Sequence, residues 1–343
     1  MRVGLDLQLA RGTATGIGEY ASGLFDALVA QGVDVVPLRS EHFDPWRFDR
    51  RVMWDQALLP LAARRARVEL LHCASGTMPL FAPVPVLVTV HDVAWLRVQS
   101  HARAYARAYF GAFSLARYRG ARRIVVDSHF SRAELLDVAP DLDASRVEVI
   151  YPGVASDFAR VVRAPGDAAP FALVTGTLER RKNFETLVRA LPAVPGLRLV
   201  SIGPSTPYRD ECLRLAAELG VLERIEMRGY VPRAEVLSLH ARATLAAVPS
   251  RYEGFGYAAA QALCAGVPLV CSNAASLPEV VGGTWPMLEP DDVGAWSEAL
   301  CALLADRAAA ETRAAAARAE HVARFAWSAC AASTARAYGA ALC

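Results

Sequence analysis

The chain has 343 residues, of which 54% are hydrophobic and 21% are charged, and its formal net charge at pH 7 is +2. This composition is typical of a globular α/β protein that is long enough for two domains. The near-neutral charge excludes a general attraction to nucleic acid, so we expect no nucleic-acid partner.

The cysteines and the apolar runs indicate where such a protein works. Seven cysteines are scattered without the spacing of a metal site, at positions 73, 212, 264, 271, 301, 330 and 343. An odd number without framework spacing favours a reducing cytosol. Residues 1–6 have the pattern of a strand and not of a signal peptide, and no apolar run approaches the ~20 residues of a membrane span. We therefore expect a cytoplasmic protein.

Short β-branched runs alternate with helical patterns along the whole chain. A first series of strands is predicted at residues 2–6, 34–38, 70–73, 86–90, 123–126 and 147–150. A second series is predicted at residues 171–175, 198–202, 225–228, 243–248 and 269–271. Helical patterns lie between them, for example at 18–31, 131–138, 183–191, 208–219 and 233–241. The alternation predicts two parallel sheets with right-handed crossovers, and so two Rossmann-like doubly wound domains.

The segment Ala164-Pro165-Gly166-Asp167-Ala168-Ala169-Pro170 separates the two series and has the composition of a hinge. We therefore predict an N-terminal domain at residues 1–164 and a C-terminal domain at 165–325. The alanine-rich end of the chain, residues 326–343, is predicted to form a helix that packs back against the first domain.

Arginines gather in two clusters in the N-terminal half, Arg64, Arg65 and Arg67, and Arg117, Arg119, Arg122 and Arg123. A solvated helix face accounts for such clusters. Docking on the anionic inner face of the plasma membrane is the alternative, which makes a membrane surface one candidate partner.

Two features of the first series suit ligand binding. A glycine-rich turn, Gly12-Thr13-Ala14-Thr15-Gly16-Ile17-Gly18, follows the first strand and precedes a helix, so its backbone amides could approach a phosphate. A strand-to-helix connection also needs glycine for its own geometry. His91-Asp92 ends the strand at 86–90, where open α/β sheets bind ligands. A neutral imidazole there could bond a sugar hydroxyl, or its bonds could be satisfied by the backbone.

Lys182 is the single lysine among 37 Lys and Arg residues. It lies in Gly176-Thr177-Leu178-Glu179-Arg180-Arg181-Lys182-Asn183, directly after the strand at 171–175. A strand, a glycine turn and two adjacent cations before a helix suit a diphosphate, which the arginine binds as a fork and the lysine as a point charge. A solvated turn is the alternative.

A second glycine-rich loop, Pro249-Ser250-Arg251-Tyr252-Glu253-Gly254-Phe255-Gly256-Tyr257, follows the strand at 243–248. Its glycines expose amides at a helix start, and Glu253 can accept hydrogen bonds from ligand hydroxyls. Gln261 lies about two turns into the helix, either facing the same site or on the surface. Ser276-Leu277-Pro278-Glu279 has the pattern of a helix capping box.

With these motifs the chain resembles the retaining glycosyltransferases of family 4, and within them bacterial mannosyltransferase-type enzymes of glycan assembly. The resemblance rests on residues 176–183 and 249–256, with support from the Gly-Ile-Gly turn, His91-Asp92, Val149-Ile150-Tyr151-Pro152-Gly153-Val154 and Ser276-Leu277-Pro278-Glu279. It implies the two-domain GT-B fold, with the nucleotide-sugar donor bound mostly by the second domain and the acceptor by the first.

The resemblance also implies a role for individual residues. Arg181 and Lys182 would hold the diphosphate near Gly16 and Gly18, and Gly176 and Thr177 would line the donor site. Glu253 and the amides of Phe255 and Gly256 would contact the donor sugar, next to Tyr257, and His91 would align the acceptor. Gln261 stands where the family's second glutamate binds the ribose. Gly229 and Val231 fall in the segment expected to line the base pocket.

The implied activity is hexosyl transfer with retention, from a GDP-, UDP- or dTDP-sugar to a glycan or lipid-linked acceptor, with GDP-mannose favoured. No further cofactor is expected, and no metal, because the sequence has no Asp-x-Asp signature at the donor site. Two alternatives remain open at this point. A sugar-nucleotide epimerase would convert the donor without any acceptor, and a catalytically silent module would bind nucleotide and turn nothing over.

Overall fold

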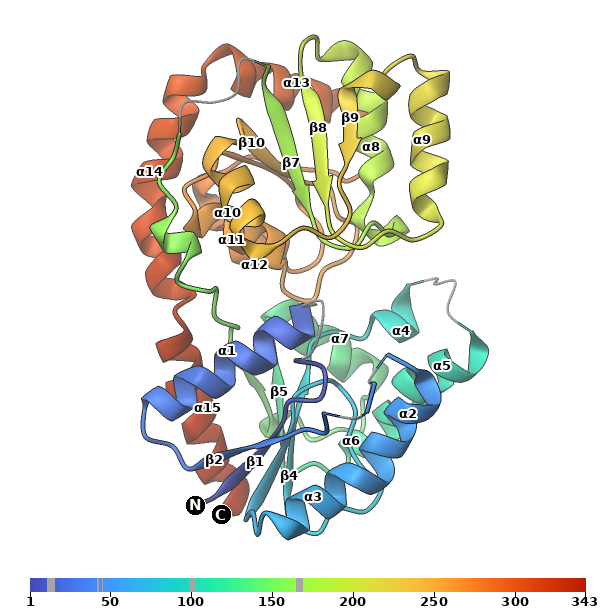
Figure 1. Ribbon diagram of the computed structural model, residues 1–343, viewed down its shortest axis with the longest axis vertical. Coiled ribbons are helices and arrows are strands. Elements are labelled where there is room, and N and C mark those ends of the chain that lie inside the picture. Colours follow the sequence, from blue (N-terminus) through green and yellow to red (C-terminus); the bar gives the residue numbers. More distant parts are fainter. Residues whose placement is uncertain (11–15, 42, 45, 99–102, 165–168) are drawn as a thin grey trace. The chain divides into compact units, whose positions relative to one another are not determined.

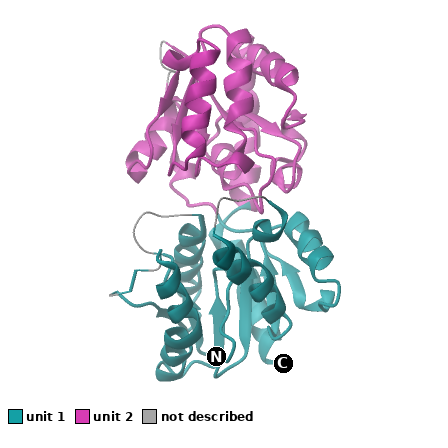
Figure 2. Ribbon diagram, turned by 90° about the vertical axis from the view of Figure 1, so that its right-hand side faces the viewer, with its two compact units in different colours: residues 1–153, 325–343 teal, residues 154–324 magenta. Residues whose placement is uncertain are grey.

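The protein divides into two compact units. It is described here from a computed structural model covering residues 1–10, 16–41, 43–44, 46–98, 103–164 and 169–343. Residues 1–153 and 325–343 form the first unit, and residues 154–324 form the second (Figure 2). This division falls eleven residues before the one proposed at 164/165, because Arg163 donates hydrogen bonds to the carbonyl oxygens of Ala241 and Ala243 in the second unit. Residues 165–168 of the expected hinge lie outside the described residues.

The first unit is built on a parallel sheet, which has six strands in the described part of the chain (Figure 1). They are β1 Val3–Asp6, β2 Val35–Leu38, β3 Leu70–Cys73, β4 Val86–Val90, β5 Arg123–Val126 and β6 Val147–Val149, in the order β2-β1-β3-β4-β5-β6. Leu87 packs with α1 and α15 on one face, and its neighbour Val88 packs with α3 on the other. Burial on both faces explains why the central strands, such as β4, are apolar runs.

The helices of the first unit connect these strands and include the end of the chain. They are α1 Gly16–Ala30, α2 Phe48–Met53, α3 Leu59–Arg65, α4 Ala94–Arg97, α5 Ala104–Ala108, α6 Ser114–Tyr118, α7 His129–Val138 and α15 Trp327–Leu342. The wider turns η1 Trp54–Leu58 and η2 Tyr109–Phe113 join α2 to α3 and α5 to α6, and η3 Ala144–Arg146 is a short 3₁₀ turn.

The predicted return of the final helix to the first domain agrees with the position of α15, which packs along α1 (Figure 1). Trp327 lies against two glycines: a Cβ added at Gly23 or at Gly153 would lie within 2.3 Å of its ring. The hydroxyl of Tyr338 lies 2.7 Å from Nδ1 of His72 on β3, and both residues are fully buried. These contacts make α15 part of the core of the first unit.

The second unit repeats the design with a parallel sheet in the order β12-β11-β10-β7-β8-β9. Its strands are β7 Phe171–Thr175, β8 Arg198–Ile202, β9 Ile225–Met227, β10 Leu245–Val248, β11 Leu269–Ser272 and β12 Met287–Leu288. Its helices are α8 Phe184–Ala190, α9 Tyr208–Glu218, α10 Arg233–Arg242, α11 Tyr257–Cys264, α12 Leu277–Val281, α13 Val293–Ala305 and α14 Arg307–Arg324. Short 3₁₀ turns are η4 Phe158–Arg160, η5 Arg180–Lys182, η6 Leu191–Ala193, η7 Leu222–Arg224 and η8 Gly282–Thr284.

The predicted fold class, two Rossmann-like doubly wound domains with a final helix on the first, is confirmed. In the second sheet the chain passes from β7 outward to β9, then returns to the other side of β7 to form β10, β11 and β12. Ligands of doubly wound folds bind at this reversal, outside the carboxyl ends of the strands. The carboxyl ends of β7 and β10 are therefore the place to look for a site.

Candidate functional site

The turn after β7 carries the two predicted diphosphate cations. Gly176 directly follows β7, and four residues later the chain forms η5, which consists of Arg180, Arg181 and Lys182. The predicted helix start at Asn183 is displaced by one residue, because Asn183 adopts the left-handed conformation with φ 56° and α8 begins at Phe184. The first turn of α8 is satisfied within the protein, since the amide of Glu185 donates to the hydroxyl of Tyr208 at 3.1 Å.

The loop after β10 brings Glu253 to both cations. Nζ of Lys182 lies 2.5 Å from Oε1 of Glu253, and Nη1 of Arg181 lies 3.4 Å from Oε2. Arg181 also donates to the carbonyl oxygen of Tyr252 at 3.2 Å and to the carboxylate of Glu179 at 3.1 Å. Glu253 thus shares one site within the second unit with two adjacent cations that precede it by 72 and 71 positions.

The charge state of Glu253 follows from this arrangement. Glu253 is only 4% exposed, and burial by itself raises the pKa of its carboxyl group. The charges of Lys182 and Arg181, with hydrogen bonds from Lys182 and Ser250, more than offset burial and hold the pKa below its ordinary value. Glu253 is therefore an acceptor that fixes the two cations. An ammonium carries three N–H donors, so Lys182 can serve Glu253 and a ligand oxygen together.

Three buried serines hold the Glu253 loop, and sequence reasoning missed this role. The hydroxyl of Ser250 donates to Oε1 of Glu253 at 2.8 Å, and that of Ser272 donates to the carbonyl oxygen of Ser250 at 2.5 Å. Ser276 donates to the carbonyl oxygen of Glu253 at 3.0 Å. The predicted capping role of Ser276 is therefore wrong: its side chain makes no cap hydrogen bond to α12, because it supports Glu253. Ser272 is the last residue of β11 and Ser276 directly precedes α12, and no sequence pattern distinguishes the contact of Ser276 from a helix cap.

Glycines follow the carboxyl ends of β7, β8 and β9, beside the two cations. The amide of Gly176 donates to Ile202, and the amide of Gly203 donates to Gly229 at 2.7 Å, so the ends of β7, β8 and β9 are joined. A Cβ at Gly203 would lie 2.2 Å from the carbonyl oxygen of Gly176, and its φ is +133°. Glycine is thus required at position 203, which was not among the predicted site residues. Thr177 lies beside Gly176 and is partly buried.

The start of α11 lies at the same edge. Gly256 has φ +96°, and a Cβ there would lie 2.7 Å from Leu277, so the chain can turn into α11 only with glycine. The ring of Phe255 is buried and meets that of Tyr257 edge-on at 5.3 Å. Gln261 is 9% exposed, which excludes the alternative of a surface residue. Val231 is also buried, two residues beyond Gly229.

The remaining predicted residues, His91, Gly16 and Gly18, belong to the first unit. Gly16 begins α1, and a Cβ at Gly18 would lie 2.6 Å from the carbonyl oxygen of Leu9. This close approach gives Gly18 a structural role. The preceding part of the predicted glycine turn, residues 12–15, lies outside the described residues.

Both ring nitrogens of His91 contact protein acceptors. Nδ1 lies 2.6 Å from Oδ2 of Asp127, and Nε2 lies 3.0 Å from the carbonyl oxygen of Ala74. Burial lowers the pKa of His91, but the charge of Asp127 and the two hydrogen bonds outweigh burial and raise it. The geometry therefore favours an imidazolium over the neutral ring expected from the sequence. Asp92 accepts from the amide of Ala94 at 3.0 Å and shapes the local turn.

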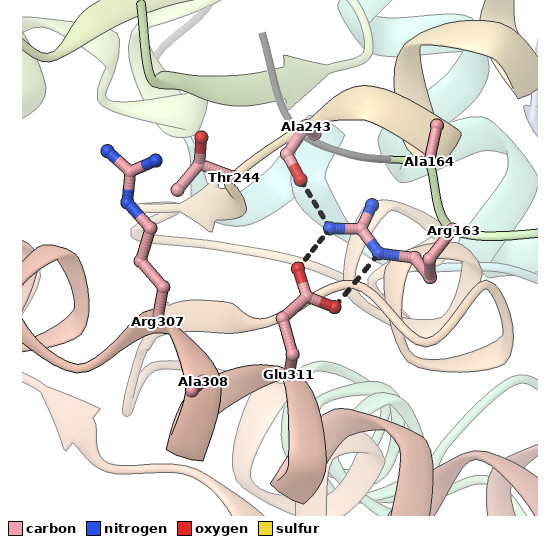
Figure 3. Close-up of a pocket in the computed structure, with 7 residues that line it drawn as sticks. All are labelled: Arg163, Ala164, Ala243, Thr244, Arg307, Ala308 and Glu311. Atoms are coloured by element: carbon pink, nitrogen blue, oxygen red, sulfur yellow. Dashed lines mark hydrogen bonds and ion pairs between the residues drawn. The ribbon is translucent and has the colours of Figure 1, made fainter. Parts of the chain in front are cut away.

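A separate pocket of about 280 Å³ lies at the other edge of the second sheet, before β7 and β10 begin (Figure 3). Arg163 points into this region from one side and binds Glu311 of α14 through Nε and Nη2. The same guanidinium donates to Ala241 and Ala243. The N–H donors of Arg163 thus join the start of the second unit to α14. This pocket is distinct from the site at the carboxyl ends of β7 and β10.

Groups of metal ligands and membrane-spanning helices are both absent from the described residues. In this part of the chain no group of three or more His, Cys, Asp and Glu side chains could hold a metal ion. In the same part of the chain no helix is both long and apolar enough to cross a membrane.

Comparison with known sequences identifies the family. Residues 14–158 match the profile described as Glycosyltransferase Family 4, and residues 156–320 match Glycosyl transferases group 1. The chain therefore belongs to the family-4 type of glycosyltransferases. This agrees with the resemblance drawn from residues 176–183 and 249–256.

Curated relatives match part of their length. The chain is 32% identical over 222 residues to D-inositol 3-phosphate glycosyltransferase of Mycolicibacterium smegmatis, covering 60% of this chain and 50% of the relative. It is 33% identical over 234 residues to O-antigen chain mannosyltransferase B of Escherichia coli, covering 64% of this chain and 60% of that protein. The match thus spans only half to three fifths of these relatives.

Solved structures share the fold over the whole chain. Sucrose-phosphate synthase from Thermosynechococcus elongatus has a TM-score of 0.78 and 22% identity, covering 99% of this chain and 98% of that one. HepE of Anabaena in complex with UDP-glucose has a TM-score of 0.75 and 18% identity, covering 99% of each chain. At these identities the likeness concerns the GT-B fold alone.

Proposed function

We propose that the protein is a retaining hexosyltransferase that moves a sugar from a nucleotide-sugar donor to a glycan or lipid-linked acceptor. The observation that carries this proposal is the cluster of Lys182, Arg181 and Glu253 at the carboxyl ends of β7 and β10. A nucleoside diphosphate leaving group develops negative charge on its β-phosphate as the glycosidic bond breaks. Two cations held in advance by a buried carboxylate stabilise that charge.

In the proposed transfer, one bond breaks and one forms, and no covalent intermediate with the protein is needed. The bond between the anomeric carbon and the β-phosphate oxygen breaks, and a bond from the acceptor oxygen forms on the same face of the sugar. The acceptor proton leaves with the nucleoside diphosphate. In this proposal Lys182 and Arg181 bind the leaving phosphate, and Glu253 keeps both of them in place.

The donor within this class is tested by thermal shift. GDP-mannose is our first candidate, and one relative, of Escherichia coli, is named a mannosyltransferase. UDP-glucose is the main competitor, since a structural neighbour is in complex with it. GDP-, UDP-, dTDP- and ADP-sugars are compared at equal concentration. A ligand at 100 times its Kd adds about 2.7 kcal/mol to the free energy of unfolding, so the true donor gives the largest rise in Tm. Equal Tm with every sugar nucleotide would contradict the proposal.

The chemistry proposed for the cations needs no divalent metal, and chelation tests this directly. With the donor identified, transfer is measured before and after dialysis against excess EDTA, with and without added Mg²⁺. We expect equal rates, because Lys182 and Arg181 supply the positive charge at the leaving group. Loss of transfer that Mg²⁺ restores would show that a metal shares this role.

The acceptor side is proposed to serve cell-surface polysaccharide, lipopolysaccharide or glycolipid synthesis, at the inner face of the membrane. The two arginine clusters differ in what they can contribute. Arg117 is only 7% exposed and stacks on Phe113, and Arg119 pairs with Asp141 at 2.6 Å. Arg64 and Arg65 at the end of α3 are exposed, and they are the residues to replace in a sedimentation assay with anionic vesicles. Unchanged binding of the double alanine variant would remove α3 from this proposal.

A further inference from the structure

The turn that carries Arg181 and Lys182 is held from outside by Arg251. The amide of Arg251 donates to the carbonyl oxygen of Arg181 at 2.8 Å. Its guanidinium donates through Nη1 to the carbonyl oxygen of Arg180 at 3.1 Å. Arg251, a residue of the Glu253 loop, therefore binds two successive carbonyl groups of η5. These bonds hold the cation pair at a fixed position relative to Glu253.

The guanidinium of Arg251 is itself anchored at two further points. Nη2 lies 2.6 Å from Oδ1 of Asp291, Nε lies 2.9 Å from the same atom, and Nη2 lies 2.9 Å from Oε1 of Glu185 on α8. The side chains of Arg251 and Asp291 are 37% and 67% exposed, so each ion pair alone adds little to stability. Their effect is to fix the fork of Arg251 in the orientation that reaches Arg180.

The segment around Asp291 is a firm base for this contact. The buried ring of Trp296 donates through Nε1 to the carbonyl oxygen of Glu289 at 3.1 Å. Asp292 caps α13 by accepting from the amide of Ala295 at 3.0 Å. Asn183, at the end of the cation turn, donates to the carbonyl oxygen of Pro290 at 2.7 Å and to Asp291 at 3.2 Å. The turn is thus tied to residues 290–291 both directly and through Arg251.

We propose that Arg251 is a positioning residue that holds the Arg181–Lys182 turn in register with Glu253 for binding a diphosphate. It acts through the carbonyl oxygens of Arg180 and Arg181 and touches no substrate. This inference rests on the proposed function of the cation pair. Loosening the turn moves Lys182 and Arg181 relative to the phosphates, where displacements of about 1 Å are costly, while the rest of the fold keeps its packing.

The test measures binding of nucleoside diphosphates and of the matching monophosphates to the whole protein by calorimetry. Variants are Arg251→Ala, Arg251→Lys, Lys182→Ala and the control Arg119→Ala, which removes an exposed fork-bound arginine in the first unit. For Arg251→Ala we expect diphosphate affinity to fall on the order of tenfold, with monophosphate affinity and Tm unchanged. Arg251→Lys keeps the charge and loses the fork, so its diphosphate affinity should lie between those of the wild type and Arg251→Ala.

A double variant sharpens the test. If Arg251 acts through the cation turn, Arg251→Ala adds less to the loss of diphosphate affinity in a Lys182→Ala background than in the wild type. Equal losses for monophosphate and diphosphate, or none for either, would overturn the positioning role. Loss with Lys182→Ala alone would overturn it and leave the proposed function standing. A wild-type protein that binds diphosphates no better than monophosphates would overturn both.

Discussion

Lys182 reaches a carboxylate that other side chains already hold in place. Glu253 is fixed by Ser250 and by its own carbonyl contact with Ser276, so the ammonium meets a prepared acceptor at 2.5 Å. The Lys182 side chain is 17% exposed, and a planar guanidinium at this position would need more room and a different direction of approach. This gives a physical reason for a lysine in a chain whose other basic residues are arginines.

Replacing Lys182 should therefore abolish most transfer whichever residue takes its place. We expect Lys182→Ala to lower kcat/KM on the order of 10²-fold or more, because the charge at the leaving phosphate is lost. Lys182→Arg should recover little, since the fork cannot occupy the same point. Arg209→Ala, which removes an exposed arginine paired with its neighbour Asp210, is the control. Initial rates with saturating acceptor measure the effect, and near-native rates for Lys182→Ala would refute the assignment.

The His91–Asp127 pair predicts a pH dependence in the first unit. Since Asp127 raises the pKa of His91 above the ordinary 6.5, the pair adds stability that is complete below about pH 6.5 and is lost as the pH rises through the folded pKa. The other titratable groups near this ring are Asp92, His72 and Tyr20. An NMR titration of the ring should give a pKa above 6.5 in the wild type and a lower one in Asp127→Asn. Equal values in the two proteins would contradict this account.

At the level of elements, the sequence located most strands within one or two residues because the central strands of each sheet are buried on both faces and are mostly apolar. The sequence did not predict β12, because a two-residue strand is too short to show a repeating pattern of apolar residues. It placed Lys182, Arg181 and Glu253 in strand-end loops, and parallel topology then brings such loops together. The serines that hold Glu253 could not be assigned in the same way, because Ser276 also fits a helix cap and only the tertiary contact decides.

The packing of α15 on α1 predicts opposite effects for two glycine substitutions. Gly23→Ala places a methyl group against the ring of Trp327 and should lower the free energy of unfolding by about 1–3 kcal/mol, despite the better helix propensity of alanine. Gly339 lies in α15 with no atom within 4 Å of the added methyl, so Gly339→Ala should stabilise by about 0.5–1 kcal/mol. Urea denaturation measures both, and a stabilised Gly23→Ala variant would show that Trp327 can move aside.

For the whole molecule, the two units should respond differently to loss of residues 325–343. These residues supply Trp327 and Tyr338, the partner of His72, to the first unit, whereas the second unit ends at Arg324. We expect the shortened chain to lose the cooperative thermal transition of the first unit and to keep that of the second. Calorimetry with and without a nucleoside diphosphate assigns each transition. Parallel loss of both would mean that the units are not independent.

The same division shows how far sequence reasoning reached for the whole molecule. Two series of strands were visible as separate patterns, and the alanine-rich end was recognisable as a helix. The boundary was placed by composition at a proline- and glycine-containing segment. The contacts of Arg163 and Phe158 place it earlier, since these residues already pack in the second unit. Composition indicates where a chain can bend, but packing determines where one unit ends.

The second unit is in effect inserted into the first, since the chain leaves at Gly153 and returns at Phe325, beside the Trp327 that covers Gly153. During synthesis, residues 154–324 can complete their own sheet as soon as they have emerged. The earlier-made sheet must wait, with the face that α15 covers open, until residues 325–343 follow. We therefore expect the N-terminal half of the chain to finish folding last, and to be the half more exposed to aggregation and proteolysis during synthesis.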